Sequence, residues 1–136
     1  MNIYLSGGMG LFGADRFDEG NSWRVYLTDK FSETEAKTFN PNDYFNFKDK
    51  MDYDSELEVM KHDLYFLNRS DLVIVNFNDP RSLGTTSELA IAYDHNIPII
   101  GLNAEHNELH PWLECFCNRI FDDIDELADY VIRMYL

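Results

Sequence analysis

The sequence predicts a single α/β domain that is doubly wound, with a mostly parallel sheet of about five strands and helices on both faces. Its 136 residues are the length of one domain and can bury an ordinary core. Short apolar runs alternate with segments of helical periodicity, as they do in βαβ units. The run DLVIVNF at 71–77 is almost continuously apolar, which indicates a strand buried on both faces in the middle of a parallel sheet.

The first part of the chain is expected to contain two strands around one helix. The apolar run at 3–5 predicts the first strand, and Asn21 and Ser22 are candidate caps for a helix at 23–33. A short strand at 36–41 is expected to stop at Pro41. The segment 42–54 is aromatic and charged, which favours an irregular connection.

The remaining elements continue the alternation. Ser55 is expected to cap a helix, with Glu58 completing a capping box. Apolar residues recur at helical spacing in this helix at Leu57, Met60, Leu64 and Leu67. After the strand at 71–77, we expect a helix at 86–96, a strand at 97–102, a short helix at 110–117, a strand at 119–122 and a helix at 124–136.

The charge of the chain excludes several classes of partner. The sequence carries 11 Lys and Arg against 25 Asp and Glu, a formal net charge of −14, with no basic cluster. Nucleic acid and anionic membranes are therefore poor partners. No apolar run is long enough to span a bilayer, and no signal peptide is recognisable. Cys115 and Cys117 are too close for an ordinary disulfide, which fits a reducing cytoplasm.

A glycine loop follows the first strand. Gly8, Gly10 and Gly13 match the G-x-G-x-x-G dinucleotide fingerprint, but that motif should open a helix at once. Here the segment 14–20 intervenes and carries acidic residues that would repel a pyrophosphate. The acidic residue expected at the end of the second strand is missing as well, since that strand ends at Asn40 and Pro41. The loop therefore favours close approach to another ligand at the carboxyl edge of the sheet.

Acidic and hydroxyl-bearing residues are expected at the same edge. Tyr4 and Ser6 belong to the first strand and its loop, Asp63 to the helix before the central strand, and Glu88 to the first turn of the next helix. A carboxylate in the first turn of a helix, as expected for Glu88, is stabilised as the anion and can act as a nucleophile, while Asp63 could hold a proton. Two carboxyl groups with separated pKa values are the minimum for cleaving a glycosidic bond.

Each of these residues also has a structural explanation. Glu88 could complement the helix dipole, and Asp63 could be a solvated charge on a helix face. Ser82, Thr85 and Thr86 could serve only as helix caps. Tyr4 could be a core aromatic residue. Convergence on one cleft is what favours a joint catalytic interpretation.

The segments IYLSG, HDLYFLNRSDLVIVNF, SLGTTSELAIAY and IPIIGL resemble the nucleoside 2-deoxyribosyltransferase family and its relatives that hydrolyse nucleoside 5′-monophosphates. The resemblance runs from residue 1 to about 102 and is strongest at 63–102. It implies a flavodoxin-like fold and active sites shared between subunits. It assigns Glu88 as the nucleophile, Asp63 as the acid that assists base departure, and Tyr4 as the residue that positions the nucleophile and the sugar.

The resemblance leaves the substrate open. It implies substrate binding by Ser6, Gly7, Gly8, Asp79, Ser82, Gly84 and His110. Transferases usually carry an acidic residue where Ser82 stands, whereas the monophosphate hydrolases tend to carry serine there. The hydrolases also place an arginine in the glycine loop, which this sequence lacks, so that Arg16 or Arg81 would have to replace it. The indications for a phosphate on the substrate are therefore divided.

His110 follows the fourth strand and is expected either to enter a neighbouring subunit's site or to cap the helix at Pro111. A zinc site made of His106, His110, Cys115 and Cys117 is an alternative, although their spacing matches none of the usual zinc signatures.

The sequence thus predicts a cytoplasmic enzyme that transfers deoxyribose between bases through a glutamate nucleophile. Hydrolysis of nucleoside 5′-monophosphates is one alternative, and a non-catalytic nucleotide-binding module is another. No metal or organic cofactor is implied. We expect the partners to be a small nucleoside or nucleotide and a second copy of the chain, in a homodimer or higher homo-oligomer.

Overall fold

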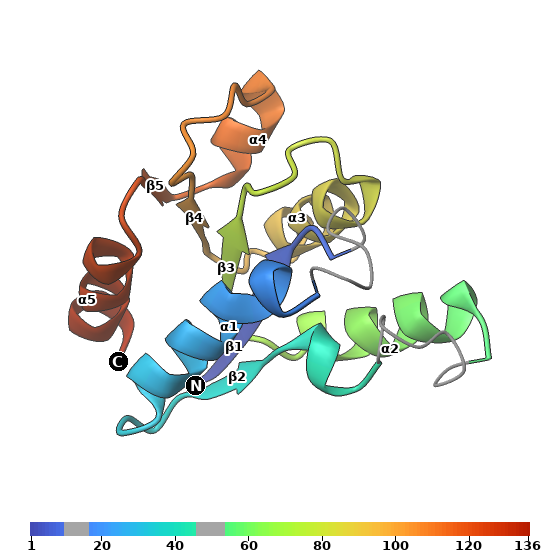
Figure 1. The fold of residues 1–136 in the computed structure, drawn as a ribbon, viewed down its shortest axis with the longest axis horizontal. Helices are drawn as coiled ribbons and strands as arrows, with labels where there is room; N and C mark the ends of the chain where they lie inside the picture. Colours follow the sequence, from blue (N-terminus) through green and yellow to red (C-terminus); the bar gives the residue numbers. More distant parts are fainter. Residues whose placement is uncertain (10–16, 46–53) are drawn as a thin grey trace.

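A computed structural model describes residues 1–9, 17–45 and 54–136 (Figure 1). The strands of this part of the chain are β1 (Asn2–Gly7), β2 (Lys37–Phe39), β3 (Leu72–Asn76), β4 (Ile99–Leu102) and β5 (Arg119–Phe121). The helices are α1 (Phe17–Phe31), α2 (Glu56–Leu67), α3 (Leu83–Asp94), α4 (Pro111–Phe116) and α5 (Ile124–Tyr135), with a 3₁₀ turn η2 at Pro41–Asp43. The predicted order of elements is confirmed.

The strands form one parallel sheet in the order β2-β1-β3-β4-β5. From β1 the chain runs outward to β2 and then returns to the other side of β1 to form β3. Ligands in such folds bind beside this reversal, at the carboxyl ends of the strands. Ser6 pairs with Val75 and Gly7 with Asn76, so β1 and β3 end at the same level. The predicted doubly wound domain is therefore confirmed.

Alternation along β1 distributes its side chains between two cores. Ile3 and Leu5 join a buried cluster with residues of α1 and α5. Tyr4 joins a second cluster on the other face, built with residues of α2, α3 and α4. This alternation directs Tyr4 and Ser6 toward the face covered by α2 and α3, the helices that carry Asp63 and Glu88.

Two helix starts differ from the expectation. Helix α1 begins at Phe17, so Asn21 and Ser22 lie inside it and do not cap it; the Ser22 hydroxyl donates to the carbonyl of Glu19 at 2.9 Å. Helix α3 begins at Leu83, three residues earlier than predicted, because Ser82 caps it.

Helix α2 has the predicted cap but a different buried face. Ser55 Oγ accepts a hydrogen bond from the Glu58 amide at 3.2 Å. The buried residues are Val59, Asp63 and Leu67, whereas Leu57 and Met60 are 54% and 51% exposed. The amino-terminal half of α2 extends away from the sheet, as Figure 1 shows, so part of its apolar stripe meets no other described element.

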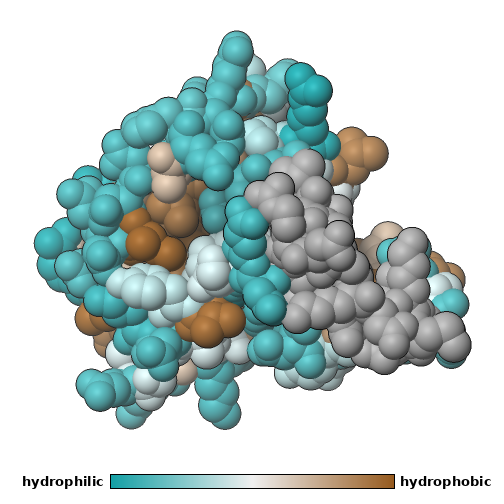
Figure 2. All heavy atoms as spheres, in the orientation of Figure 1, coloured by the Kyte–Doolittle hydropathy of each residue, from teal (hydrophilic) through white to brown (hydrophobic). Residues whose placement is uncertain are grey.

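The surface agrees with the acidic composition. Figure 2 shows that the face seen in Figure 1 is largely hydrophilic, with small separate apolar patches. None of the helices in the described ranges is both long and apolar enough to cross a membrane.

Candidate active site

The predicted catalytic residues come together where β1 and β3 end. Tyr4 lies on β1, Asp63 on α2 and Glu88 on α3, and the charges of both carboxyl groups act on the Tyr4 hydroxyl. The charge of Asp63 also acts on Glu88. The three groups therefore form one electrostatic cluster, as the sequence predicted from their separate positions in the chain.

The surroundings of Glu88 favour its carboxylate form less than the sequence predicted. It lies in the second turn of α3, because the helix begins at Leu83, and no acidic residue occupies the first turn. Burial raises the pKa of Glu88 to about 7, and the nearby charge of Asp63 adds to this effect. The hydroxyls of Tyr4 and Ser6 lower the pKa in part, although neither makes a hydrogen bond of full geometry to Oε2. The expectation of a carboxylate held ionised by the helix dipole is therefore wrong.

Asp63 is buried, with a side chain that is 10% exposed. Burial raises its pKa to about 7. Its Oδ1 lies 3.8 Å from Nδ1 of His62. Asp63 can therefore hold a proton near neutrality, as expected. Its pKa is nevertheless raised to the same value as that of Glu88, so the predicted difference between an ionised and a protonated carboxyl is not found.

Tyr4 is a core residue and a site residue at once. Its ring is buried and stacks on Phe39, with the ring centroids 5.2 Å apart. Burial, reinforced by the negative charges of Glu88 and Asp63, raises the pKa of Tyr4 well above its ordinary value. The phenol therefore stays protonated at neutral pH and can donate a hydrogen bond to a carboxylate.

The site is marked by buried polar atoms that have no hydrogen-bond partner. Folded proteins leave few such atoms unsatisfied. In the described ranges they are Tyr4 Oη, Ser6 Oγ, Trp23 Nε1, Arg24 Nη1, Asn42 Oδ1, His62 Nδ1, Asp63 Oδ1 and Glu88 Oε2. Most of them belong to the cluster around Glu88 and Asp63. Such a concentration is expected where a polar ligand completes the hydrogen bonds.

The glycine loop is packed tightly against the loop that follows β3. The Gly8 amide donates to Asn78 Oδ1 at 3.1 Å, and a Cβ on Gly8 would lie 2.6 Å from Asp79 Cβ. Gly8 and Asp79 are therefore brought together, as a shared substrate site requires. Gly10, Gly13 and Arg16 lie outside the described residues.

The dinucleotide interpretation stays unfavourable, although the acidic residues that oppose it lie in a helix and not in the predicted loop. Asp18 and Glu19 lie in the first turn of α1, not in a loop before the helix. Two acidic residues at a helix amino terminus oppose the binding of a pyrophosphate there.

Gly8 and Gly84 offer a matched pair for testing this packing. Gly8→Ala forces Asp79 away from the loop, and overpacking of this kind costs about 1–3 kcal/mol. We expect thermal unfolding to shift down by about 5 °C. Gly84→Ala meets nothing within 4 Å and leaves the unfolding temperature unchanged or slightly higher. Equal unfolding temperatures for the two variants would contradict the close approach at Gly8.

Two further predicted site residues act as helix caps. Ser82 Oγ accepts from the Thr85 amide at 3.2 Å and is 3.0 Å from Thr85 Oγ1. His110 Nδ1 accepts from the Trp112 amide at 3.2 Å, so His110 caps α4. The structural explanation for each is therefore confirmed, and any contact of theirs with substrate would be additional. Arg81 is exposed, and its amide donates to Asp79 Oδ1 at 3.3 Å.

The zinc alternative is not supported. His106, His110, Cys115 and Cys117 all lie in the described part of the chain, where no three metal-ligating side chains come together. Cys115 and Cys117 are free cysteines, and burial raises the pKa of Cys117 to about 12, which disfavours the thiolate that a metal needs.

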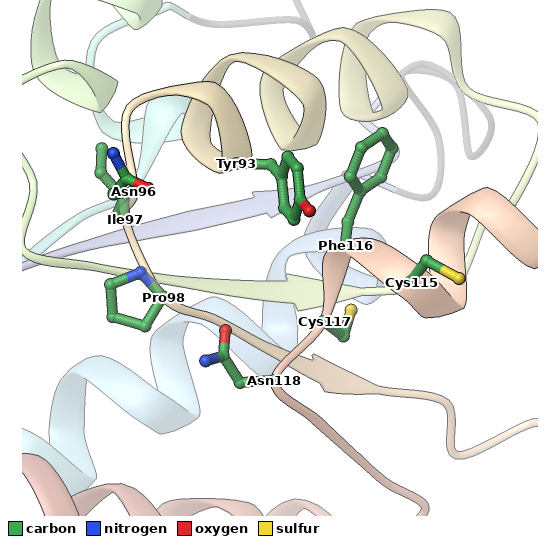
Figure 3. Close-up of a pocket in the computed structure, with 8 residues that line it drawn as sticks. All are labelled: Tyr93, Asn96, Ile97, Pro98, Cys115, Phe116, Cys117 and Asn118. Atoms are coloured by element: carbon green, nitrogen blue, oxygen red, sulfur yellow. The ribbon is translucent and has the colours of Figure 1, made fainter.

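A separate surface hollow of about 410 Å³ lies at the opposite edge of the sheet. Figure 3 shows Tyr93 of α3 and Phe116 of α4 at its wall, with Pro98 before β4 and Cys117 before β5. The amino ends of β4 and β5 border it, whereas ligands in doubly wound sheets bind at the carboxyl ends. We therefore place the candidate active site at Glu88 and Asp63 and not in this hollow.

One residue of the site was missed from the sequence. Arg24 is fully buried in α1, and its positive charge acts on Glu88, Asp63 and Tyr4. No local pattern marks it, because an arginine within a helix ordinarily lies in solvent.

The fold occurs in several solved structures. The chain matches a 2-deoxyribosyltransferase from Bacillus psychrosaccharolyticus with a TM-score of 0.74 and 16% identity, over 96% of this chain and 92% of that one. It matches CMP N-glycosidase BcmB from Clostridium botulinum with a TM-score of 0.69 and 19% identity, over 100% of both chains. A conserved protein from Enterococcus faecalis V583 has a TM-score of 0.78 and 16% identity, over 98% of both chains. The resemblance predicted from the sequence is therefore confirmed as a shared fold.

A scan of the sequence against protein-family models finds no match, and a search of curated proteins finds no relative.

Proposed function

We propose that this chain, on the fold it shares with nucleoside deoxyribosyltransferases, cleaves the N-glycosidic bond of 2′-deoxynucleosides and transfers deoxyribose to another base. The observation that carries the proposal is the cluster of Glu88, Asp63 and Tyr4 at the carboxyl edge of the sheet, with unpartnered polar atoms around it. Tyr4 and Asp63 are buried, and Glu88 is half-buried with its Oε2 shielded from solvent. A nucleophile, an acid and a positioning donor are the groups that a retaining glycosidic mechanism needs.

In the first step the Glu88 carboxylate attacks C1′ of the sugar. The bond between C1′ and the base nitrogen breaks, and its electron pair goes to the base, to which Asp63 donates its proton. The neutral Tyr4 hydroxyl orients the attacking carboxylate through a hydrogen bond. The transition state has oxocarbenium character, and the product is a glycosyl ester of Glu88.

The second step is the reverse with a new acceptor. A nitrogen of the incoming base attacks C1′, the Glu88 ester bond breaks, and Glu88 leaves as the carboxylate. The ionised Asp63 takes the proton that the incoming base loses. Water in place of the base would give hydrolysis.

Hydrolysis of nucleoside 5′-monophosphates is the second candidate. The likeness to a CMP N-glycosidase and the serine at position 82 favour it. The position of Asp79 favours a free nucleoside instead, because its carboxylate lies beside the glycine loop, where it would repel a phosphate.

A non-catalytic binding module is disfavoured by the carboxyl groups of Glu88 and Asp63. Both have pKa values raised to about 7 by burial, so ionising them opposes folding. A protein that only binds a nucleotide has little use for two such groups.

The direct test is incubation with 2′-deoxynucleosides and a second free base, with the products separated by chromatography. We expect a new nucleoside and a released base. Base release from 5′-monophosphates alone would favour the hydrolase, and the absence of both reactions over a broad panel would exclude the enzyme.

The pH profile of kcat/KM is expected to be a narrow bell centred near pH 7. Glu88 must be ionised and Asp63 protonated, and both groups titrate at about 7. Activity therefore falls on the acidic side as Glu88 gains its proton and on the alkaline side as Asp63 loses its own. A flat profile from pH 5 to 9 would contradict these roles.

We further propose a homodimer with shared sites. An apolar groove between α3 and α4 is lined by residues that include the exposed Leu83 and Trp112, and it reaches His110. Exposed apolar surface of this kind is typical of subunit contacts, and two-fold symmetry is the commonest closure.

Mixing two inactive variants tests this assembly. A hybrid dimer of Glu88→Ala and His110→Ala chains has one site free of both lesions, so activity should reappear. His110→Asn keeps a capping side chain and serves as the control for α4. Full activity in a monomer, measured by light scattering, would contradict the shared site.

A further inference from the structure

Arg24 is a buried cation that is fixed by the backbone and not by a partner carboxylate. Its Nε donates to the carbonyl of Leu5 at 3.2 Å and its Nη2 to that of Gly7 at 2.9 Å. The guanidinium lies over the Trp23 ring, 4.6 Å from the centroid. Its Nη1 has no hydrogen-bond partner, and no ion pair joins it to a carboxylate of the described residues.

A buried charge of this kind needs compensation from its surroundings. The acidic groups that act on it come from four elements: Glu88 of α3, Asp63 of α2 and Asp43 of η2 supply carboxyl groups, and Tyr4 of β1 supplies a phenol that is neutral at pH 7. Glu88 contributes most among these groups. Asp43 is exposed and so is largely screened by water. The charge of Arg24 is therefore compensated mainly by the carboxyl groups of Glu88 and Asp63.

Charge balance selects one protonation state of the carboxyl pair. When a single carboxyl is ionised, its charge and that of Arg24 cancel inside the buried site. Two protons on the pair would leave the guanidinium uncompensated, and two carboxylates would leave a net negative charge. Because burial penalises any uncompensated charge, the singly ionised pair is favoured. That is the state in which one group attacks and the other donates a proton.

We propose that Arg24 is the positioning residue and counter-charge of the Glu88–Asp63 pair, which it holds in the singly ionised form while its two hydrogen bonds fix the end of β1 beside Ser6. This inference rests on the proposed function. Burial lowers the pKa of Arg24 only to about 10, so the guanidinium keeps its charge throughout the working range.

The test compares a neutral and a charged replacement. Arg24→Gln removes the charge but keeps an amide donor for the carbonyls of Leu5 and Gly7, and Arg24→Lys keeps the charge. Without the cation both carboxyl groups hold their protons more tightly. The whole kcat/KM bell of Arg24→Gln should therefore move to higher pH by about one unit, with activity about threefold lower at pH 7 and recovered at pH 8. Arg24→Lys should keep the optimum near that of the wild type.

Arg69→Gln is the matched control, because it removes the same charge from an exposed arginine stacked on Tyr65 before β3. Its bell should not move. If Arg24 only held the backbone, Arg24→Gln and Arg24→Lys would both lower the bell without shifting it, and this result would overturn the proposal. Unfolding temperatures establish that each variant is folded.

A second readout separates this proposal from the proposed function. Carbon-13 NMR of labelled Asp and Glu side chains follows the two carboxyl titrations in the absence of any substrate. An upward shift in Arg24→Gln supports the counter-charge even if no substrate is turned over. An active wild type whose carboxyl titrations and pH optimum are unchanged in Arg24→Gln overturns the counter-charge and leaves the proposed function standing.

Discussion

Glu88→Gln is expected to abolish turnover while the protein stays folded. The substitution keeps the size of the side chain and removes the only oxygen anion that can attack C1′ in the proposed scheme. Loss of a covalent nucleophile costs about 10⁴-fold in rate or more. Single-turnover assays with the favoured nucleoside measure the loss directly, and mass spectrometry should find no glycosyl ester on the variant.

The same variant has a stability signature that a simple loss of structure would not produce. The pKa of Glu88 is raised to about 7 in the folded protein, above the value of an unfolded chain, by burial. Its ionisation therefore favours the unfolded state, and stability is lost as the pH rises through 7. Glu88→Gln should unfold at a higher temperature than the wild type at pH 8, with a smaller difference at pH 5. Near-normal activity in the folded variant would remove Glu88 from the mechanism.

The order of the elements could be predicted because each has a strong local signal. The almost continuous apolar run before Asn76 specifies a central strand, and Ser55 followed by Glu58 specifies the start of α2. Glu88 and Asp63 were predictable for a topological reason. They lie on helices at consecutive crossings of a parallel sheet, where the carboxyl ends of neighbouring strands meet.

The remaining features depend on contacts that have no local pattern. The raised pKa of Glu88 follows from burial, which outweighs the lowering effect of the Tyr4 and Ser6 hydroxyls. Arg24 belongs to no sequence motif, and its burial depends on the packing of α1 against β1. Leu57 and Met60 have the spacing of a core face, but they are exposed because the amino-terminal half of α2 extends away from the sheet (Figure 1).

Asp63→Asn is expected to lower the rate by about 10²- to 10⁴-fold with ordinary deoxynucleosides, the range that a positioned general acid supplies. The amide cannot give up a proton, so the base must leave with its negative charge unquenched. The alkaline limb of the pH profile should disappear in this variant, because the group that titrates there is gone, while the acidic limb of Glu88 stays. Asp71→Asn is the matched control: Asp71 accepts from the Asn2 amide at 2.7 Å at the opposite edge of the sheet, so activity should not change.

The size of the Asp63→Asn defect should depend on the leaving group, and this dependence separates an acid from a structural residue. A deoxynucleoside with an N7-methylated purine already carries a positive charge on its base, which departs as a neutral molecule without a proton from the protein. With such a substrate the variant should approach the wild-type rate, whereas the unmethylated nucleoside should show the full loss. A residue that merely supports the cleft would affect both substrates alike. Equal losses for the two substrates would therefore exclude Asp63 as the acid.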